Sequence, residues 1–286
     1  MVAAQFPDLA GLPVTRFGGG WDNELFCVGG EWIFRFPRRA ERVPWLAREI
    51  QIMALVAETP DAQRAVIPVF ERIGEPGPAF PYPFVGYRRV PGVGADLVCA
   101  RDPAGLAADI GGLLSALHRV DPSRVPPTPD DWEHELWGEL RAELAAVADV
   151  VRPLLGADLL PEVERYLAGQ VPEPPQDGPR RFIHNDICPD HLIADASTGR
   201  LNALIDFTDA MVGDPVVDFV GLIGLGGYPF IHRVAAAYDL PLGDGFGAKL
   251  GWLSRVLSLT WLADAVADDP DSVGKHLSWV RSAFRR

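Results

Sequence analysis

Two short segments in the C-terminal half carry side chains that suit the transfer of a phosphoryl group. They are FIHNDICPDH at residues 182–191 and ALIDF at residues 203–207. A carboxylate at Asp186 would face the hydroxyl group that attacks the γ-phosphate of a nucleotide. His191 and Asp206, on two adjacent short strands, would hold the Mg²⁺ ion that neutralises the phosphates. The pattern therefore predicts a phosphoryl-transfer site.

The spacing of these residues resembles the catalytic loop of protein kinases, H-x-D-x-x-x-x-N, followed by an aspartate of the D-F-G type. Two positions depart from that pattern, because His191 replaces the asparagine and Thr208 replaces the glycine. A histidine must be neutral to bind metal, and imidazole is a poorer ligand for Mg²⁺ than an amide oxygen. We therefore expect His191 to act partly through water, and activity to fall at acid pH.

The composition is that of an ordinary globular protein. The chain has 286 residues, of which 48% are hydrophobic and 23% are charged, so it is long enough for two lobes. No segment approaches the run of about 18 uncharged apolar residues that a membrane span needs. The N-terminus has neither a basic region nor a long apolar core, which argues against a signal peptide. We expect a cytoplasmic protein and a monomer.

The charge, the cysteine content and the lysine content each exclude a class of partner, compartment or nucleotide site. The net charge of -13 predicts repulsion of nucleic acid and of anionic membranes, and attraction of cations. The three cysteines are too few and too scattered for a disulfide framework, which agrees with a reducing compartment. The chain has only two lysines, and its single Gly-Lys pair, Gly274-Lys275, is followed by histidine. A Walker-type phosphate loop is therefore absent.

The N-terminal part reads as a small β-lobe. Apolar runs at residues 25–28 and 31–36 are joined by Gly29-Gly30, which predicts an antiparallel hairpin. A glycine-rich turn precedes it, and there the backbone amides of Gly19 and Gly20 would approach a phosphate closely. Further strands are expected at residues 66–73 and 83–90.

One helix is expected within this lobe, after Pro44. Its apolar side chains recur at helical spacing and leave Glu49 beside the buried stripe. In the C-terminal part, helices are expected at residues 106–117, 132–151 and 159–169, and from residue 215 to the end. Short strands are expected on both sides of the catalytic loop. The chain is thus an α+β protein.

The order of these parts is the order of parts in a kinase. A glycine-rich turn, a strand with Arg35, a helix with Glu49 and a hinge precede the helical lobe and the catalytic loop. Arg35 would hold the phosphates, and Glu49 would orient Arg35. Most kinases have lysine at the position of Arg35, and a planar guanidinium reaches phosphate as a fork instead of as a point charge. A mere surface ion pair between Arg35 and Glu49 is the other interpretation.

Nearly the whole chain is similar to the aminoglycoside phosphotransferase family, kinase-like enzymes that inactivate antibiotics or phosphorylate other small alcohols. The histidine at the metal position and the Asn185-Asp186 pair resemble the aminoglycoside 2''-phosphotransferases and the macrolide 2'-phosphotransferases. The motifs that carry the resemblance are GWDN at 20–23, WIFRFP at 32–37, FVGY at 84–87, HNDICPDH at 184–191, and LIDF at 204–207.

The resemblance implies a two-lobed protein-kinase-like fold, with a β-rich N-lobe over residues 1–90 and a mainly helical C-lobe over residues 91–286. It makes Asp186 the catalytic aspartate, and His191 and Asp206 the magnesium ligands. The segment that includes Arg88 and Val90 becomes the hinge that reads the nucleotide base.

The resemblance also implies that Asp218 braces the catalytic loop from behind. The phosphoryl donor would be ATP or GTP, since relatives of the 2'' type use either nucleotide.

The acceptor is expected to bind the helical section of the C-lobe. Residues 126–180 contain twelve acidic residues and four arginines, a negative field that suits a polycationic aminoglycoside. Asp131, Glu133 and Glu135 are the candidate acceptor-binding residues, although a solvated helix face accounts for them equally well. A macrolide is the alternative acceptor, and the apolar segment 250–267 would supply its pocket. Carboxylates converging on Asp186 would favour the aminoglycoside, and a wide aromatic and aliphatic wall would favour the macrolide.

Two other interpretations compete with the kinase. His184, Asp186, Cys188 and His191 could form a zinc cluster, but closed zinc sites favour pairs of cysteine or histidine, and Asp206 would have no role. We expect His184 to be a buried histidine that is hydrogen-bonded to the backbone. A nucleotide-binding pseudokinase that regulates a partner is the second alternative, suggested by Arg35 and His191.

Overall fold

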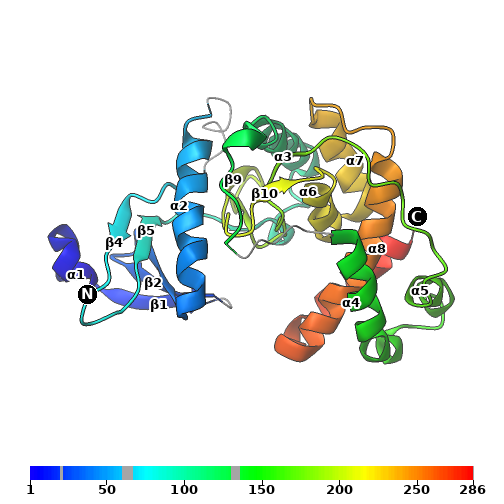
Figure 1. The fold of residues 1–286 in the computed structure, drawn as a ribbon, viewed down its shortest axis with the longest axis horizontal. Coiled ribbons are helices and arrows are strands. Elements are labelled where there is room, and N and C mark those ends of the chain that lie inside the picture. The colour runs from blue at the N-terminus through cyan, green and yellow to red at the C-terminus, as the bar shows by residue number, and fades with distance from the viewer. Residues whose placement is uncertain (20–21, 60–66, 130–135, 286) are drawn as a thin grey trace.

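The structure is a computed structural model that describes residues 1–19, 22–59, 67–129 and 136–285, without the side chains of residues 136–139. It has two lobes, a β-sheet lobe at the N-terminus and a larger, mainly helical lobe (Figure 1). The helix α2 lies between the N-terminal sheet and the C-lobe (Figure 1). Among the residues that the structure describes, every helix is either too short or too polar to span a lipid bilayer.

The N-lobe is an antiparallel sheet with the strand order β1-β2-β3-β5-β4. Gly29 and Gly30 connect β2 to β3 with φ angles of 65° and 76°. Together with Glu31 they form a three-residue connection, since Val28 pairs with Trp32. Positive φ at two successive glycines allows the chain to reverse this tightly, and the predicted antiparallel hairpin is confirmed. The elements of this lobe are α1 (Val2–Gln5), β1 (Val14–Gly19), β2 (Asn23–Val28), β3 (Trp32–Pro37), α2 (Val43–Ala57), β4 (Arg72–Gly74) and β5 (Phe84–Arg88).

The two faces of this sheet have different tasks because side chains alternate along a strand. On the outer face, Trp32, Phe34 and Phe36 of β3 pack with Phe84 and with residues near the N-terminus in a small apolar core. Arg35 lies between Phe34 and Phe36 along β3, so its side chain projects from the opposite, inner face, toward α2. The sheet thus presents the basic side chain of Arg35 toward α2 and the C-lobe.

The strand expected at residues 66–73 was predicted too long. Among the described residues of that stretch, only Arg72 and Ile73 belong to a strand, in β4. Pro68 lacks a backbone N–H and cannot donate to a sheet ladder, which accounts for an irregular approach to β4.

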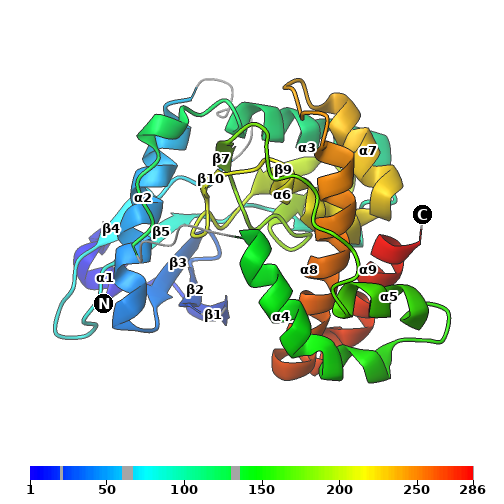
Figure 2. The ribbon, with the colours of Figure 1, turned by 45° about the vertical axis from the view of Figure 1, so that its right-hand side comes forward.

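The C-lobe contains one large hydrophobic core. The long helix α8 runs through it, with α4 packed alongside (Figure 2). Its elements are β6 (Val93–Gly94), α3 (Pro103–Leu117), α4 (Leu136–Val151), α5 (Leu160–Leu167), β7 (Arg181–Ile183), β8 (Leu192–Ala194), β9 (Leu201–Leu204), β10 (Met211–Gly213), α6 (Val217–Val220), α7 (Gly227–Ala237), α8 (Phe246–Asp268) and α9 (Val273–Phe284).

Two small sheets hold the predicted catalytic segments. β6, β8 and β9 form one sheet, and β7 pairs with β10 in the other. The catalytic loop connects β7 to β8, and the segment with Asp206 follows β9. Because the Ile205 N–H donates to the His191 carbonyl at 3.0 Å, the two segments lie side by side.

Candidate active site

A buried carboxylate fixes the backbone of the catalytic loop. Asp218, in the first turn of α6, has no exposed surface. Its two oxygens accept hydrogen bonds of 2.8 Å from the N–H groups of His184 and Asn185. Asn185 has a φ of 67°, a left-handed conformation that asparagine tolerates better than most residues. The turn at Asn185 leaves the next side chain, Asp186, 48% exposed.

Asp218 has a further buried partner that sequence reasoning missed. The Nε2 atom of His118, on α3, lies 3.0 Å from a carboxylate oxygen of Asp218, and its Nδ1 atom lies 2.8 Å from the Tyr238 hydroxyl. His118 and Asp218 are 100 residues apart, so no local pattern connects them. The loop is therefore held by a chain of three buried polar side chains.

His184 supports the site without entering it. Its Nε2 atom lies 3.0 Å from the Ile205 carbonyl, and its Nδ1 atom lies 3.3 Å from the Asp186 N–H. Burial lowers the pKa of His184 to about 4, so the ring is neutral at physiological pH. A neutral ring that donates from Nε2 and accepts at Nδ1 satisfies both contacts. This is the buried, backbone-bonded histidine that the sequence predicts.

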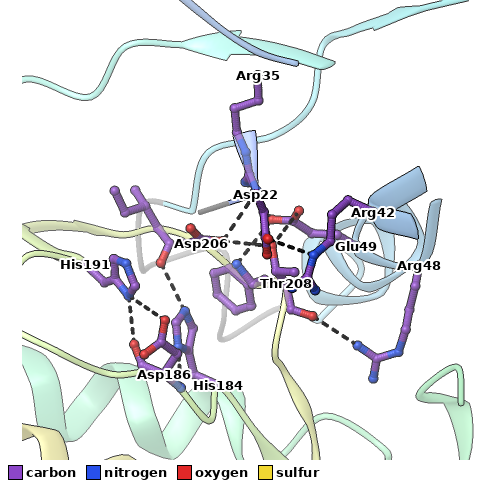
Figure 3. A network of polar contacts seen from close by, with 12 residues as sticks. Asp22, Arg35, Arg42, Arg48, Glu49, His184, Asp186, His191, Asp206 and Thr208 are labelled. Carbon is purple, nitrogen blue, oxygen red and sulfur yellow. Dashed lines mark hydrogen bonds and ion pairs between the residues drawn. The ribbon is translucent and has the colours of Figure 1, made fainter. Parts of the chain in front are cut away.

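His191 lies against Asp186 (Figure 3). Its Nδ1 atom is 2.8 Å from the Asp186 carbonyl and 3.3 Å from a carboxylate oxygen of the same residue. Burial would lower the pKa of His191, but a hydrogen bond with Cys188 and the charges of Cys188, Asp186 and Asp206 outweigh it and raise the pKa well above its usual value. Desolvation by the surrounding protein raises the pKa of Asp186, and the charge of His191 opposes that rise.

Asp206 faces the same space from the segment after β9. It has a φ of 67°, and its carboxylate is 40% exposed. Burial of part of this side chain would raise its pKa, but the charges of Arg35 and His191 outweigh it and lower the pKa to about 2. Asp206 is therefore an ionised and partly exposed carboxylate, which suits a hard cation.

Arg35 and Glu49 form a buried ion pair, which excludes the surface-pair interpretation. The Arg35 Nη1 atom lies 2.8 Å from a Glu49 carboxylate oxygen, and the two side chains are 7% and 1% exposed. The other guanidinium nitrogen of Arg35 lies 3.4 Å from Asp206 and 3.2 Å from the Thr208 hydroxyl. The arginine fork thus reaches α2 and the Asp206 segment at once.

Thr208, which replaces the kinase glycine, completes this network (Figure 3). Its hydroxyl lies 3.1 Å from a Glu49 oxygen and 2.9 Å from an Asp206 oxygen. Glu49 also accepts the Phe207 N–H at 3.2 Å. These contacts tie α2 of the N-lobe to the metal-binding segment predicted in the C-lobe.

Arg48 is a second residue that the sequence did not single out. It is buried, and it donates to the carbonyls of Pro126, Pro127, Thr208 and Ala210 at distances of 2.7 to 3.4 Å. One guanidinium therefore satisfies carbonyls from two segments and holds them against α2.

Comparison with known proteins agrees with this geometry. A family model described as the phosphotransferase enzyme family matches residues 13–254. The chain belongs to this family. Among solved structures, the GDP complex of wild-type aminoglycoside 2'-phosphotransferase-IIIa shares 27% sequence identity, with a TM-score of 0.75 over 99% of this chain and 96% of that chain.

Two more distant structures share the fold of this phosphotransferase. The streptomycin–ATP complex of an aminoglycoside 2''-phosphotransferase is 17% identical, with a TM-score of 0.64 over 98% of this chain and 93% of that chain. The macrolide 2'-phosphotransferase apoenzyme of Brachybacterium faecium is 20% identical, with a TM-score of 0.65 over 100% of this chain and 99% of that chain. The predicted family and kinase-like fold are confirmed, and the protein is a small-molecule kinase.

Only some of the residues expected to bind the nucleotide lie together near Asp206 in this phosphotransferase. Gly19 pairs with Glu24 across the first hairpin, and Gly20 lies outside the described residues. The Arg88 guanidinium lies 4.1 Å from the centre of the Trp32 ring, on the outer face of the sheet. A role in reading the base would therefore fall to the backbone of that segment, which includes the partly buried Val90, and not to the Arg88 side chain.

The acceptor residues expected from sequence, Asp131, Glu133 and Glu135, lie outside the described residues. The structure instead shows a cavity of about 470 Å³ beside Asp186, walled by the C-terminal half of α8 and by α9. Its lining includes the carboxylates Asp190, Asp264, Asp268 and Asp269 and the aromatic side chains Trp261 and Trp279. Sequence reasoning missed these carboxylates, although acidic residues on an apolar helix were a usable signal.

Proposed function

We propose that this kinase transfers the γ-phosphoryl group of ATP or GTP to a hydroxyl group of an aminoglycoside. The observation that carries the proposal is the cavity at Asp186, whose lining holds four further aspartates. One of them, Asp190, pairs with Lys275 at 3.2 Å, so Asp264, Asp268 and Asp269 supply the excess negative charge beside the space that an acceptor would occupy. An aminoglycoside carries several ammonium groups, and such a field attracts and orients them. Solved structures of similar proteins contain kanamycin with GDP, or streptomycin with ATP, which supports this substrate class and both nucleotides.

Two of the cavity carboxylates are placed where they repel each other. Asp264 and Asp268 are four residues apart on α8, so they share one face of the helix. Burial raises the pKa of Asp264, and the charge of Asp268 raises it further. Like charges at this spacing cost stability unless a cation lies between them. A bound ammonium group would remove that cost, so we propose Asp264 and Asp268 as acceptor-binding residues.

Asp186 is the proposed catalytic residue. Its half-exposed carboxylate opens on the cavity, so it can accept or direct the proton of an acceptor hydroxyl group. Arg35 is proposed to hold the phosphates from the N-lobe side, in the orientation that Glu49 fixes. Because phosphoryl transfer depends on positioning and charge neutralisation, the rigid Asp218 brace contributes to catalysis through the loop backbone.

The donor set fits Mg²⁺ through Asp206 better than through His191. Asp206 offers an ionised oxygen, the ligand that Mg²⁺ prefers, whereas the His191 ring contacts Asp186 and is a softer ligand. We propose that Asp206 binds the ion directly, and that His191 contacts it through water once the cation has displaced the proton that the neighbouring negative groups hold on the ring. When bound, the ion would offset the negative charge of the phosphates.

A screen with radiolabelled ATP and GTP against aminoglycosides and macrolides tests the proposal. We expect transfer to at least one aminoglycoside, and loss of turnover by orders of magnitude in Asp186→Ala. Asp264→Asn and Asp268→Asn should raise KM for the aminoglycoside far more than KM for the nucleotide. Asp244→Asn, which removes an exposed carboxylate outside the cavity, is the matched control. Transfer that survives in Asp186→Ala, or unchanged KM in both α8 variants, would refute these assignments.

A macrolide is the second candidate acceptor. The same cavity has an apolar wall formed by Leu257, Trp261 and Trp279, with the two indole rings edge to face at 6.1 Å. If the screen finds transfer to macrolides only, Trp261→Ala should weaken binding of the macrolide. Asp264→Asn and Asp268→Asn should then leave KM for the macrolide unchanged. Any transfer that depends on Asp186 would also eliminate the regulatory pseudokinase. Antibiotic resistance, a cytoplasmic location and a monomeric state stay predictions.

A further inference from the structure

Three side chains of different chemistry meet in the catalytic loop. The Cys188 sulfur, one ring nitrogen of His191 and one carboxylate oxygen of Asp186 all lie within 4.8 Å of one another. Within residues 1–19, 22–59, 67–129 and 136–285, this is the one group of three or more such ligands. The two softest ligands, the Cys188 sulfur and the His191 ring nitrogen, are therefore neighbours in the folded loop.

This set of donors suits zinc and does not suit magnesium. Thiolate and imidazole are ligands that Zn²⁺ favours, whereas Mg²⁺ favours oxygen. Zinc bonds of about 2.0 to 2.3 Å place two ligands of a tetrahedral ion roughly 3.5 Å apart. The three atoms would need to approach one another by at most about 1.3 Å, the difference between 4.8 Å and roughly 3.5 Å, and side-chain rotation supplies such a shift. Asp186 and Cys188 line the cavity, which offers an entry path.

The site would be open and not structural. A closed zinc site has four protein ligands, and His184 cannot be the fourth because its Nε2 atom is committed to the Ile205 carbonyl. The backbone of the loop is held by Asp218 through the N–H groups of His184 and Asn185, so it does not depend on a metal. Three protein ligands with a free fourth position would leave room for water.

We propose that the catalytic loop is an inhibitory zinc site formed by Asp186, Cys188 and His191. On binding, the Cys188 thiol and the protonated His191 ring each release a proton, and the thiolate sulfur and the freed ring nitrogen coordinate the ion. The ion would coordinate the Asp186 carboxylate, which we propose accepts or directs the proton of the acceptor hydroxyl group. Zinc should therefore inhibit phosphoryl transfer even when magnesium is in excess. The inhibition rests on the proposed role of Asp186, but the binding does not.

Cobalt tests the binding without any substrate. Titration of Co²⁺ into the full-length, magnesium-free protein should produce a thiolate-to-cobalt charge-transfer absorption, which Zn²⁺ then abolishes by displacement. Cys188→Ser and Cys188→Ala should both lack this absorption band. Competition with a chromophoric chelator should show that their zinc affinity is reduced by about 100-fold or more. Residues that only hydrogen-bond to a metal ligand already contribute roughly 10- to 100-fold to affinity, so loss of a ligand should cost at least as much. Cys99→Ser is the matched control, since Cys99 is a partly exposed cysteine outside the trio.

The possible results distinguish failure of the zinc site, failure of the inhibition and failure of the proposed substrate class. A cobalt complex without a thiolate band, or equal zinc affinity in the Cys188 and Cys99 variants, would overturn the site. Zinc binding with no effect on transfer would overturn the inhibition. The proposed substrate class would fail in a different way, because zinc would bind Cys188 normally while no aminoglycoside was phosphorylated. Thermal melts of each variant, and inhibition measured against its own zinc-free rate, account for any loss of folding or activity.

Discussion

Arg35 of β3 and Glu49 of α2 are joined by a 2.8 Å ion pair that is almost entirely buried. Burial would lower the pKa of Arg35, but the charges of Glu49 and Asp206 outweigh it and raise the pKa, so the guanidinium stays charged. Both side chains also contact the segment after β9, through Asp206 and Thr208. The ion pair is therefore a link between the lobes as well as part of the phosphate site.

A double-mutant cycle should separate these two roles. Glu49→Leu alone leaves a buried guanidinium without its main partner, and we expect the free energy of unfolding to fall by about 3 to 5 kcal/mol. Arg35→Met with Glu49→Leu removes both charges and should restore most of that loss, because similar apolar groups can replace a buried pair. Urea denaturation measures the stability. Turnover should stay low in the double variant, and a double variant as active as the wild type would contradict the phosphate-binding role.

Arg35→Lys examines the fork geometry. The arginine reaches Glu49 with one nitrogen and both Asp206 and Thr208 with another, and a single ammonium group cannot reproduce that span. We expect a rise in KM for the nucleotide and a lower kcat, with the fold retained in circular dichroism. Lysine supporting full activity would show that charge alone is needed at this position.

The buried chain of Asp218, His118 and Tyr238 predicts a second effect. Asp218→Asn replaces one acceptor oxygen by an NH₂ group that faces backbone N–H donors, which should cost about 1 to 3 kcal/mol of stability. His118→Gln should have a smaller effect of the same sign. Turnover should fall more than substrate affinity in both variants, since the loop that carries Asp186 is displaced. His232→Gln changes an exposed histidine and should be neutral in both assays.

Gly221 predicts a steric effect on the same loop. A Cβ atom at Gly221 would lie 1.5 Å from the Ile187 carbonyl oxygen, so the catalytic loop must move in Gly221→Ala. A displacement of about 1 Å at a reacting group can cost on the order of 100-fold in rate, and we expect a loss of that size in kcat. Gly112→Ala is the control, because nothing lies within 4 Å of its added Cβ and alanine favours the helix. Equal activity in the two variants would contradict the close packing.

The sequence predicts those parts of the site that depend on local pattern. The Gly29-Gly30 hairpin follows from the φ angles that only glycine adopts readily, and the placement of Glu49 follows from helical periodicity. Arg35 was identified from the order of the parts along the chain. The structure then brings its guanidinium into contact with both Glu49 and Asp206.

Other parts of the site depend on contacts that local pattern does not encode. His118 meets Tyr238 across 120 residues, and Arg48 meets Pro126 across 78. The α8 carboxylates reach the cavity only because α8 packs beside the catalytic loop. β4 is short because a strand is defined by its partner, and of the described residues 67–74 only Arg72, Ile73 and Gly74 pair with β5. Tertiary packing decides such features, so sequence periodicity cannot supply them.

The raised pKa of Asp209 predicts that the stability of the fold depends on pH. Burial, followed by the charges of Asp186, Asp206 and Asp22, raises its pKa from 3.8 to about 6. Between those values the folded state holds more protons at this site than the unfolded state, so its contribution to stability falls as pH rises. At neutral pH the ionised carboxylate therefore destabilises the fold. Removing its charge in Asp209→Asn should stabilise the metal-free protein by about 1 to 3 kcal/mol at neutral pH.

The gain in Asp209→Asn should disappear below about pH 4, where the aspartate is protonated in both states. Urea denaturation of the metal-free protein across this range measures the difference, and Asp244→Asn, at an exposed site, should show no such trend. A charge kept near Asp186 and Asp206 at a cost in stability is typical of a functional site. Turnover of Asp209→Asn should therefore fall while its stability rises. A variant less stable than the wild type at neutral pH would show that Asp209 is paired in the fold and not repelled.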